Sequence, residues 1–386
     1  MTGKTALPGT LAILLLLAVI VVAFAGRQLH NYWFEEFSLP ASNSLFQVAS
    51  GTSLAQVIND MSARKLLGDS RVAKIALRLF QPGITVKAGE YRLPERASRA
   101  GLFEIFASGV SVQHSVTLVE GITARDALLE INRALSALGA ASNASAVNPG
   151  AASNGNAEAG GIPVDIQLKA LLSSRALELM HETANPEGWF FPDTYYFVRG
   201  ETAEDILRRA HRRMLAVLDE EWPLRQADLP YARPYQALIM ASIVEKETGA
   251  VEEREQIAGV FLRRLQKGMR LQTDPTVIYG MREIYKGNLT RAHLKRDTPY
   301  NTYTRSGLPP TPIALPGRGA IHAALHPADG DALYFVAKGD GSHQFSKTLE
   351  EHQRAVRKYQ VLQRRSDYRS SPPASADKPV LKSGAG

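Results

Sequence analysis

The sequence contains no cysteine, and this absence excludes several kinds of site at once. In 386 residues there is no thiol for a disulfide, for cysteine-ligated zinc or for nucleophilic catalysis. No Gly-rich phosphate loop and no serine elbow is present either. His322 and His326, spaced i, i+4 on a predicted helix, have no acidic residue close by in the sequence, and we interpret them as a structural pair. The sequence therefore predicts neither a cofactor nor a metal site.

Dense charge of one sign is also scarce. The net charge is +7, and the basic residues form only short runs, such as residues 358–365. No basic stripe interleaved with aromatic residues occurs, so we expect no nucleic-acid partner. A mildly basic surface suits an anionic polymer or a membrane face instead. With 45% apolar and 22% charged residues, the composition is that of a globular protein long enough for two or three domains.

An uninterrupted apolar run, residues 11–25, lies near the N-terminus. With its flanking residues it is long enough to cross the ~30 Å hydrocarbon layer of a membrane. A Tyr-Trp-Phe triplet at 32–34 follows at the depth where aromatic rings favour the headgroup region. A cleaved signal peptide is the alternative, because residues 23–25 fit its cleavage pattern. We predict a transmembrane anchor at 11–30, with residues 1–10 in the cytoplasm and the rest of the chain exported.

A small α/β unit is predicted after the anchor. Residues 44–64 have the pattern of a strand, a turn and an amphipathic helix, residues 70–80 that of a second helix, and residues 86–94 that of another strand. Residues 114–131 repeat the strand-to-helix scheme. The pattern resembles the LysM-like module of cell-wall enzymes, and a packing domain without a ligand of its own is the alternative. We assign this module and the following α/β segment to residues 40–132.

Two further segments consist almost entirely of small and polar residues. Residues 133–163 have too little apolar bulk to offset the entropy lost on ordering, so we predict a flexible insertion there. Residues 366–386 are predicted to form a disordered tail. Between them, residues 164–365 combine amphipathic helices, a hairpin pattern and long loops. The predicted fold class is therefore α+β, with an N-terminal single-pass membrane helix, a small LysM-like α/β module and a C-terminal mixed α+β domain.

The segment ASIVEKETGA, residues 241–250, ends an apolar helix with two glutamates. At 3.6 residues per turn Glu247 continues the apolar stripe of Ile243 and Val244, while Glu245 lies about 200° around the helix from Glu247. A carboxyl on such a stripe near a helix C-terminus has its pKa raised by desolvation and by the helix dipole. It would stay protonated near neutral pH, as general acid catalysis on a sugar oxygen requires. The alternative is that both glutamates are solvated or form salt bridges.

Two loops carry polar side chains suited to a binding cleft. Gln272 and Asp274 follow a helix predicted at residues 251–267, and Asn301 and Tyr303 lie in the Pro-rich segment 298–317. A long loop of this kind is usually functional or disordered, and its aromatic and amide content argues against disorder. Amides, hydroxyls and aromatic faces together are what a saccharide site needs. A purely structural loop is the alternative.

Several motifs give the sequence a long and specific resemblance to a known family. They are ASIVEKETG at 241–249, LQTDPTVIYG at 271–280, YNTYTRSGLPPTPI at 300–313, HPADGDALYF at 326–335 and, towards the N-terminus, EGWFFPDTYYF, VEGIT and KAGEYRLP. With these motifs the chain resembles the endolytic murein transglycosylases of the MltG/YceG-like family. Only residues 134–163 and the end of the chain lack a counterpart.

The resemblance implies a protein of the bacterial inner membrane whose catalytic domain faces the periplasm. It implies cleavage within peptidoglycan glycan strands, between N-acetylmuramic acid and N-acetylglucosamine. The products would end in 1,6-anhydro-N-acetylmuramic acid, as in a lyase-type intramolecular transfer, and cleavage would terminate strand elongation. The second glutamate of the E-K-E-T motif maps onto the catalytic Glu247. The candidates for positioning substrate are Glu245, Gln272, Asp274, Asn301 and Tyr303.

Two other functions are compatible with the sequence. Asp274 could pair with Glu247 as in a lysozyme-like peptidoglycan hydrolase, since ordinary glycosidases use two carboxyl groups. The chain could also be a non-catalytic, membrane-tethered peptidoglycan-binding scaffold, although its intact E-K-E-T motif argues against that. The expected partners are peptidoglycan glycan strands, the inner membrane and, from the resemblance, peptidoglycan synthases of the penicillin-binding class.

Overall fold

The computed structural model describes residues 9–40, 44–49, 51–142, 164–180 and 184–363. The predicted tail at 366–386 and most of the predicted insertion at 133–163 lie outside these residues, as do residues 1–8 of the predicted cytoplasmic segment. The chain divides into two compact units, the first drawn from residues 1–114 and 196–201 and the second from residues 115–195 and 202–386.

The first unit combines four helices with short antiparallel strand pairs in its described residues. Strand β2 pairs with β3, from Leu45 opposite Arg92 to Val48 opposite Gly89, and β1 pairs with β4. The predicted second helix, residues 70–80, coincides with α3. The elements are α1 (Gly9–Phe34), β1 (Phe37–Ser38), β2 (Leu45–Val48), α2 (Leu54–Ala63), α3 (Ser70–Phe80), β3 (Gly89–Arg92), β4 (Arg96–Ala97) and α4 (Arg99–Ser108).

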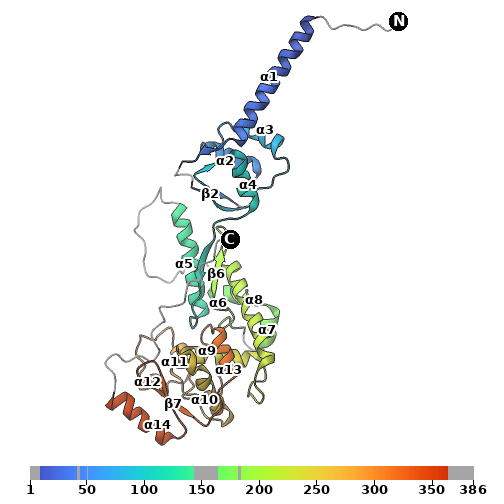
Figure 1. Cartoon of the computed structure of the whole chain (residues 1–386). Helices are drawn as coiled ribbons and strands as arrows, with labels where there is room; N and C mark the ends of the chain where they lie inside the picture. The colour runs from blue at the N-terminus through green and yellow to red at the C-terminus, as the bar shows by residue number, and fades with distance from the viewer. Residues whose placement is uncertain (1–8, 41–43, 50, 143–163, 181–183, 364–386) are drawn as a thin grey trace. The chain divides into compact units, whose positions relative to one another are not determined.

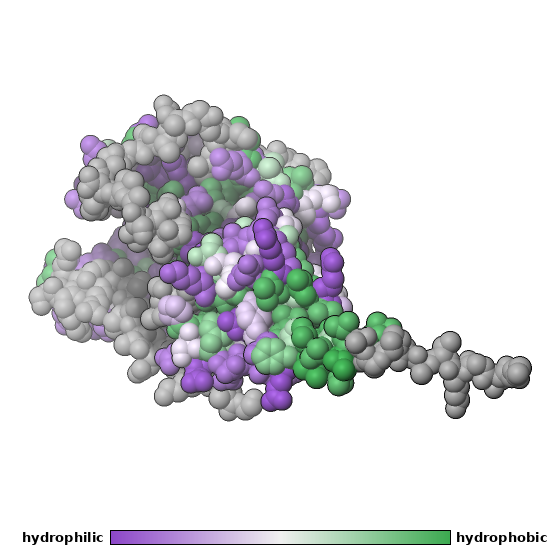
Figure 2. All heavy atoms as spheres, turned by 90° about the horizontal axis from the view of Figure 1, so that it is seen from above, coloured by the Kyte–Doolittle hydropathy of each residue, from purple (hydrophilic) through white to green (hydrophobic). Residues whose placement is uncertain are grey.

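Helix α1 has two parts with different surroundings. Its N-terminal part exposes apolar side chains to the outside, and Figure 2 shows them as a green surface beside the grey N-terminal residues. Residues Ile13–Phe34 are long and apolar enough to cross a membrane. At its C-terminal end Trp33 is fully buried and stacks on Phe103 of α4, with 5.6 Å between ring centroids. The last turns of α1 therefore belong to the core of the first unit.

The second unit is mainly helical, and β7 pairs with β8 within it; β5 pairs with β6 where the chain passes from one unit to the other. The elements from residue 114 onward are β5 (His114–Thr117), α5 (Ala124–Ser142), α6 (Val164–Lys169), α7 (Ser174–Met180), β6 (Thr194–Phe197), α8 (Ala203–Glu221), α9 (Pro234–Glu247), α10 (Arg254–Gln266), α11 (Asp274–Gly280), α12 (Arg291–Lys295), α13 (Arg318–Leu325), β7 (Tyr334–Ala337), β8 (His343–Ser346) and α14 (Leu349–Val356). Short 3₁₀ turns at Trp222–Leu224 and Val251–Glu253 and a π-helical turn at Arg357–Leu362 complete it. The whole chain is thus a mixed α+β protein.

Helix α9 lies at the centre of the second unit, packed against α7, α10, α11 and α13 (Figure 1). It begins with Pro234 in its first turn, where the missing N–H costs nothing, and ends when Thr248 adopts an extended conformation. Every residue from Ala237 to Val244 is buried, so the helix is covered on all sides and not along one stripe as the sequence pattern predicted. Only the ends of α9, at residues 234, 236 and 245–247, reach exposed or partly exposed positions.

Two helix boundaries differ from the sequence-based expectation. Helix α5 continues to Ser142, so the first residues of the predicted flexible insertion are helical. These residues include Ala and Leu, which favour helix even where they have little to pack against. The predicted loop at Gln272 and Asp274 is shorter than expected, because Asp274 is already the first residue of α11.

Candidate active site

Glu247 is the last residue of α9, and its carboxyl group is partly buried beside the start of α11. The hydroxyl of Thr273, the residue before α11, donates a hydrogen bond to Glu247 Oε1 at 2.5 Å. Thr273 is itself fixed, because its backbone N–H donates to Thr302 Oγ1 at 3.1 Å. The position of the carboxyl group is therefore set by side chains from two separate loops.

The surroundings of Glu247 favour its protonated form. Burial, which is the largest cause, and the nearby Asp274 carboxylate together raise the pKa of this carboxyl group from 4.5 to about 7. The Thr273 hydroxyl and the charge of Arg264 act in the opposite direction but do not offset burial. An acid with a pKa near 7 can donate a proton at neutral pH and receive it back as the carboxylate, which is what a general acid–base catalyst must do.

Glu247 opens into a pocket of about 460 Å³, within the size range of ligand sites. The pocket lies between the loop before α11, the β7–β8 hairpin and α14, and its walls combine aromatic rings with acids, amides and imidazoles. Three of the predicted site residues, Gln272, Asp274 and Tyr303, line it together with Glu247. The other lining residues are Phe261, Arg264, Leu271, Tyr334, Phe335, Val336, Ala337, His343, Leu349, His352, Val356 and Gln360.

Asp274 is the second carboxylate of this pocket. The Tyr303 hydroxyl donates to Asp274 Oδ1 at 2.6 Å, which fixes the orientation of the carboxylate. Burial, together with this hydrogen bond, raises the pKa of Tyr303, so its hydroxyl remains a donor. Gln272 holds a left-handed backbone conformation, with φ of 52°, and its N–H donates to Thr302 O at 3.2 Å. This conformation is unfavourable for a non-glycine residue, and the hydrogen bond to Thr302 helps to hold it.

Arg264 on α10 fixes the floor of the pocket. Its guanidinium is buried and donates to Leu271 O and to Leu333 O, each at 2.7 Å, so it ties the loop before α11 to the start of the hairpin. It also lies over the Tyr334 ring at 5.0 Å from the centroid. Its hydrogen bonds are to neutral carbonyl groups, so its positive charge remains available to stabilise a carboxylate form of Glu247.

His343 lines the same pocket and was not found by reasoning from the sequence. Its Nδ1 lies 2.7 Å from Glu253 Oε2, and its backbone N–H donates to Glu253 Oε1 at 2.9 Å. These two contacts with Glu253 fix the orientation of the ring in the wall of the pocket. Glu253 and His343 are 90 residues apart in the chain, so no local spacing announces the pair.

Two predicted site residues, Glu245 and Asn301, lie outside the pocket and bind other parts of the chain. Glu245 has a buried side chain that forms an ion pair with Arg254 at 3.1 Å and accepts a hydrogen bond from Gly317 N at 2.9 Å. Asn301 is fully buried, and its amide nitrogen donates to the carbonyl groups of Leu294 at 3.0 Å and Arg296 at 2.6 Å. Neither residue lines the pocket, because the polar side chain of each is occupied in fixing the backbone around it.

A second buried acid, Glu187, lies outside the pocket. Burial raises its pKa to about 7, and it accepts hydrogen bonds from Ala124 N at 2.8 Å and from the Tyr279 hydroxyl at 3.1 Å. It therefore binds the first N–H of α5. His322 and His326 stack at 4.1 Å between ring centroids, and His322 Nδ1 lies 3.0 Å from Glu221 Oε2. Among the described residues, no group of three or more His, Cys, Asp or Glu side chains is arranged to hold a metal.

Comparison with known proteins identifies relatives of this chain. The profile of the YceG-like family matches residues 46–358. An endolytic murein transglycosylase from Bacillus subtilis (strain 168) is 40% identical over 177 residues, which cover 45% of this chain and 48% of the relative. An endolytic murein transglycosylase from Streptococcus pneumoniae (strain ATCC BAA-255 / R6) is 33% identical over 178 residues, or 44% and 31% of the two chains.

The matches to these curated relatives span about half and about a third of their lengths. Among solved structures, the crystal structure of a putative YceG-like protein from Listeria monocytogenes is 27% identical. It matches with a TM-score of 0.47, over 83% of this chain and 98% of that one.

Proposed function

Because the chain belongs to the YceG-like family, whose profile matches most of its length, we propose that it is an endolytic lytic transglycosylase of peptidoglycan. It would cleave bonds between N-acetylmuramic acid and N-acetylglucosamine within nascent glycan strands. The relatives named endolytic murein transglycosylases support the substrate class. The observation that carries the proposal is Glu247, an acid with a pKa of about 7 in a pocket walled by Tyr303, Tyr334 and Phe335.

The proposed reaction uses Glu247 twice. The protonated carboxyl group donates to the glycosidic oxygen as the bond to C1 of the muramic acid breaks. The resulting carboxylate then takes the proton of the C6 hydroxyl of the same sugar, whose oxygen attacks C1 and closes the 1,6-anhydro ring. An intramolecular nucleophile has a large effective concentration, so no activated water is needed. The charge on Asp274 would stabilise the positive charge that develops at C1.

Asp274 also supports the second candidate function, a lysozyme-like hydrolase. It lies in the same pocket as Glu247, is oriented by Tyr303 and is close enough to raise the pKa of Glu247. In that reaction the Asp274 carboxylate would activate a water molecule or attack C1 itself. The two functions differ in whether an atom from water enters the new chain end.

We assign the surroundings of the enzyme on the same basis. The chain would be anchored once in the bacterial inner membrane by α1, with a LysM-like module at residues 40–132 and the catalytic domain, residues 164–365, in the periplasm. Cleavage in that position would terminate strand elongation next to peptidoglycan synthases, which are the proposed protein partners. The apolar α1 helix and the cell-wall enzymes among the relatives support an envelope location.

The test is turnover of purified peptidoglycan by the full chain in detergent, because removing α1 would take Trp33 out of the core. We expect Glu247→Gln to lower the release of glycan fragments by roughly a thousandfold, since it removes the general acid. Glu245→Gln is the matched control on the same helix end, and it should retain activity in whatever fraction remains folded. Full activity in Glu247→Gln would refute the proposal.

A further inference from the structure

Helix α3 carries a row of apolar side chains that nothing in the described part of the chain covers. Val72, Ile75 and Leu79 are 37%, 55% and 63% exposed. They are spaced i, i+3 and i+7, so they lie on one face of the helix, and we call them the apolar row. A different side of α3, with Ala76 and Leu77, is buried in the core of the first unit.

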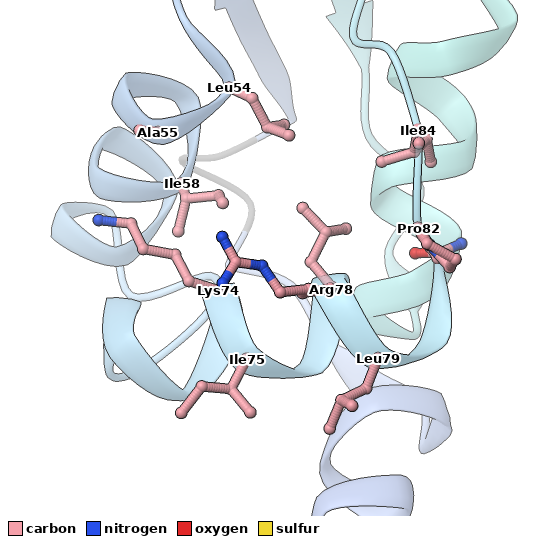
Figure 3. A pocket seen from close by; sticks show the side chains of 12 residues that line it. Leu54, Ala55, Ile58, Lys74, Ile75, Arg78, Leu79, Pro82 and Ile84 are labelled. Atoms are coloured by element: carbon pink, nitrogen blue, oxygen red, sulfur yellow. The ribbon is translucent and has the colours of Figure 1, made fainter.

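Three exposed basic side chains, Arg71, Lys74 and Arg78, occupy the side of α3 between its buried side and the apolar row. Figure 3 shows Lys74 and Arg78 pointing towards α2, whereas Ile75 and Leu79 point away from it. An apolar row next to arginine and lysine is the pattern of a helix that lies in a membrane surface rich in anionic headgroups.

The pocket between α2 and α3 has the same chemical character. It has a volume of about 810 Å³, and its walls include Leu54, Ile58 and Ile84 together with Lys74 and Arg78 (Figure 3). None of its lining residues is acidic. This side of the first unit therefore presents apolar and cationic groups, which are complementary to an anionic amphiphile.

Helix α3 ends next to the candidate membrane helix. The Phe80 ring has its centroid 5.3 Å from that of Phe34 and 5.9 Å from that of His30, both on α1. At about 1.5 Å per residue the predicted anchor, residues 11–30, crosses a hydrocarbon layer of about 30 Å, so His30 lies at the edge of that layer. The headgroup layer on each side of a bilayer is about 5–8 Å thick. Contact with α1 therefore holds the end of α3 near the depth of the headgroups.

We propose that α3 lies on the surface of the membrane that α1 crosses. The apolar row enters the interface between headgroups and acyl chains, and the three basic side chains bind the phosphate groups of anionic phospholipids. The proposal rests on the proposed anchoring by α1. Its consequence is that the first unit has a fixed orientation on the bilayer, and does not swing freely at the end of α1.

The absence of cysteine makes single-site labelling a direct test. Three variants of the full chain, Ile75→Cys, Val110→Cys and Val19→Cys, carry an environment-sensitive fluorophore in vesicles of phosphatidylglycerol and phosphatidylcholine. Val110 is the matched control, because it is an exposed apolar residue in the same unit. It follows the C-terminal end of α4, whereas Arg99 is at the N-terminal end of that helix. Val19 is exposed on α1 and reports the anchor itself.

Quenching by lipids that carry a nitroxide on the acyl chain should be strong at position 19. At position 75 it should be at least about threefold stronger than at position 110, with emission shifted to the blue. Strong quenching at 19 with equal, weak quenching at 75 and 110 would overturn the proposal and leave the anchor intact. Weak quenching at 19 would refute the anchor. A blue shift at 75 that disappears when the chain is diluted in more lipid would indicate a second copy as the occupant, and would also overturn the proposal.

A charge variant tests the role of the basic side chains. In the Ile75→Cys background, changing Arg71, Lys74 and Arg78 to Gln should weaken the contact by about fivefold per side chain on anionic vesicles. With the three basic side chains unchanged, replacing the anionic vesicles by vesicles of phosphatidylcholine alone should weaken the contact to a comparable extent. Quenching at position 75 that does not depend on the anionic lipid would contradict binding through these residues.

Discussion

At the residue scale, the two glutamates at the end of α9 are distinguished by their partners. Glu245 has the charge of Arg254 and the N–H of Gly317 to stabilise its carboxylate form. Glu247 has one hydroxyl, from Thr273, and a neighbouring carboxylate on Asp274. Burial raises the pKa of both carboxyl groups; the ion pair with Arg254 opposes this rise at Glu245, whereas the pKa of Glu247 reaches about 7.

Glu247 should make the stability of the fold depend on pH. Its folded-state pKa is raised from 4.5 to about 7, so the folded state binds the proton more tightly than the unfolded chain. Protonated Glu247 contributes about 3 kcal/mol to the free energy of unfolding at pH values below 4.5, its pKa in the unfolded chain. This contribution is lost as the pH rises through the folded-state pKa of about 7. We predict that Glu247→Gln, which stays neutral, is more stable than the wild type at about pH 8 but not at about pH 5.

Urea unfolding at the two pH values measures the effect. Glu187, whose pKa is also about 7, is present in both proteins, so the difference between them isolates Glu247. Glu245→Gln is the control, because loss of its ion pair with Arg254 should destabilise the fold. A Glu247→Gln variant with the same pH dependence as the wild type would show that the carboxyl group has an ordinary pKa.

Thr273 should control the upper pH limit of activity. Its hydrogen bond favours the carboxylate form of Glu247, so Thr273→Val should raise the pKa of Glu247 further. The alkaline limb of the pH–rate profile should then move up by as much as about one pH unit. Thr273→Ser keeps the hydroxyl and should retain the wild-type profile. A shift in Thr273→Ser as large as that in Thr273→Val would contradict control by the hydrogen bond, because serine retains the hydroxyl group.

Part of the site could be predicted from these residues alone. Glu247, Gln272, Asp274 and Tyr303 line one pocket. They were predictable because acids, amides and aromatic residues that occur together in polar loops indicate a binding site. Glu245 and Asn301 have the same polar character in the sequence. Their structural roles depend on backbone groups that only the folded chain brings near, so sequence alone gave no means to separate them.

At the scale of elements, the loop that contains Asn301 and Tyr303 positions the start of α11. Asn301 binds the carbonyl groups at the end of α12, and Thr302 accepts from Thr273 N. Tyr303 orients Asp274. The loop has no regular structure, yet its hydrogen bonds make it a fixed wall of the pocket.

Two substitutions in this loop should separate stability from activity. Asn301→Ala removes the donor from two partly buried carbonyl groups, and should lower stability by about 1–3 kcal/mol and activity with it. Tyr303→Phe removes only the hydroxyl that holds Asp274, and should change stability by less than about 1 kcal/mol. Its turnover should fall roughly tenfold, because the carboxylate loses its orientation. Thermal melts and initial rates check both, and equal melting temperatures for the two variants would contradict this division of roles.

Helix starts in this chain are predictable where a local signal sets them. Thr202 with Asp205 and Thr348 with Glu351 form the capping boxes that their spacing predicts, at the starts of α8 and α14. The pairing of His343 with Glu253 carries no such signal, since it depends on the β7–β8 hairpin folding back against the turn before α10. Local chemistry thus locates elements, while contacts between distant segments complete the pocket.

At the scale of the whole molecule, α1 is both a candidate membrane helix and a part of a soluble core. Trp33 is fully buried, and the carbonyl group of Tyr32 accepts a hydrogen bond from Arg99 Nη1 at 2.6 Å. We predict that Trp33→Ala destabilises the first unit by about 3–5 kcal/mol, as expected for removal of a buried aromatic side chain. Limited proteolysis of the full chain should then cut within residues 44–110 first. Phe34→Ala, at a more exposed neighbouring position, is the control and should remain resistant.

The central claim is that one acid, Glu247, and the substrate's own hydroxyl group carry out the cleavage without water. The most direct test is digestion of peptidoglycan by the full chain in water enriched in oxygen-18, with mass spectrometry of the new chain ends. We predict ends that are one water lighter than reducing ends and that contain no oxygen-18. Reducing ends that carry one oxygen-18 atom per cleaved bond would contradict the claim, and would assign Asp274 the role of activating water or forming a covalent intermediate.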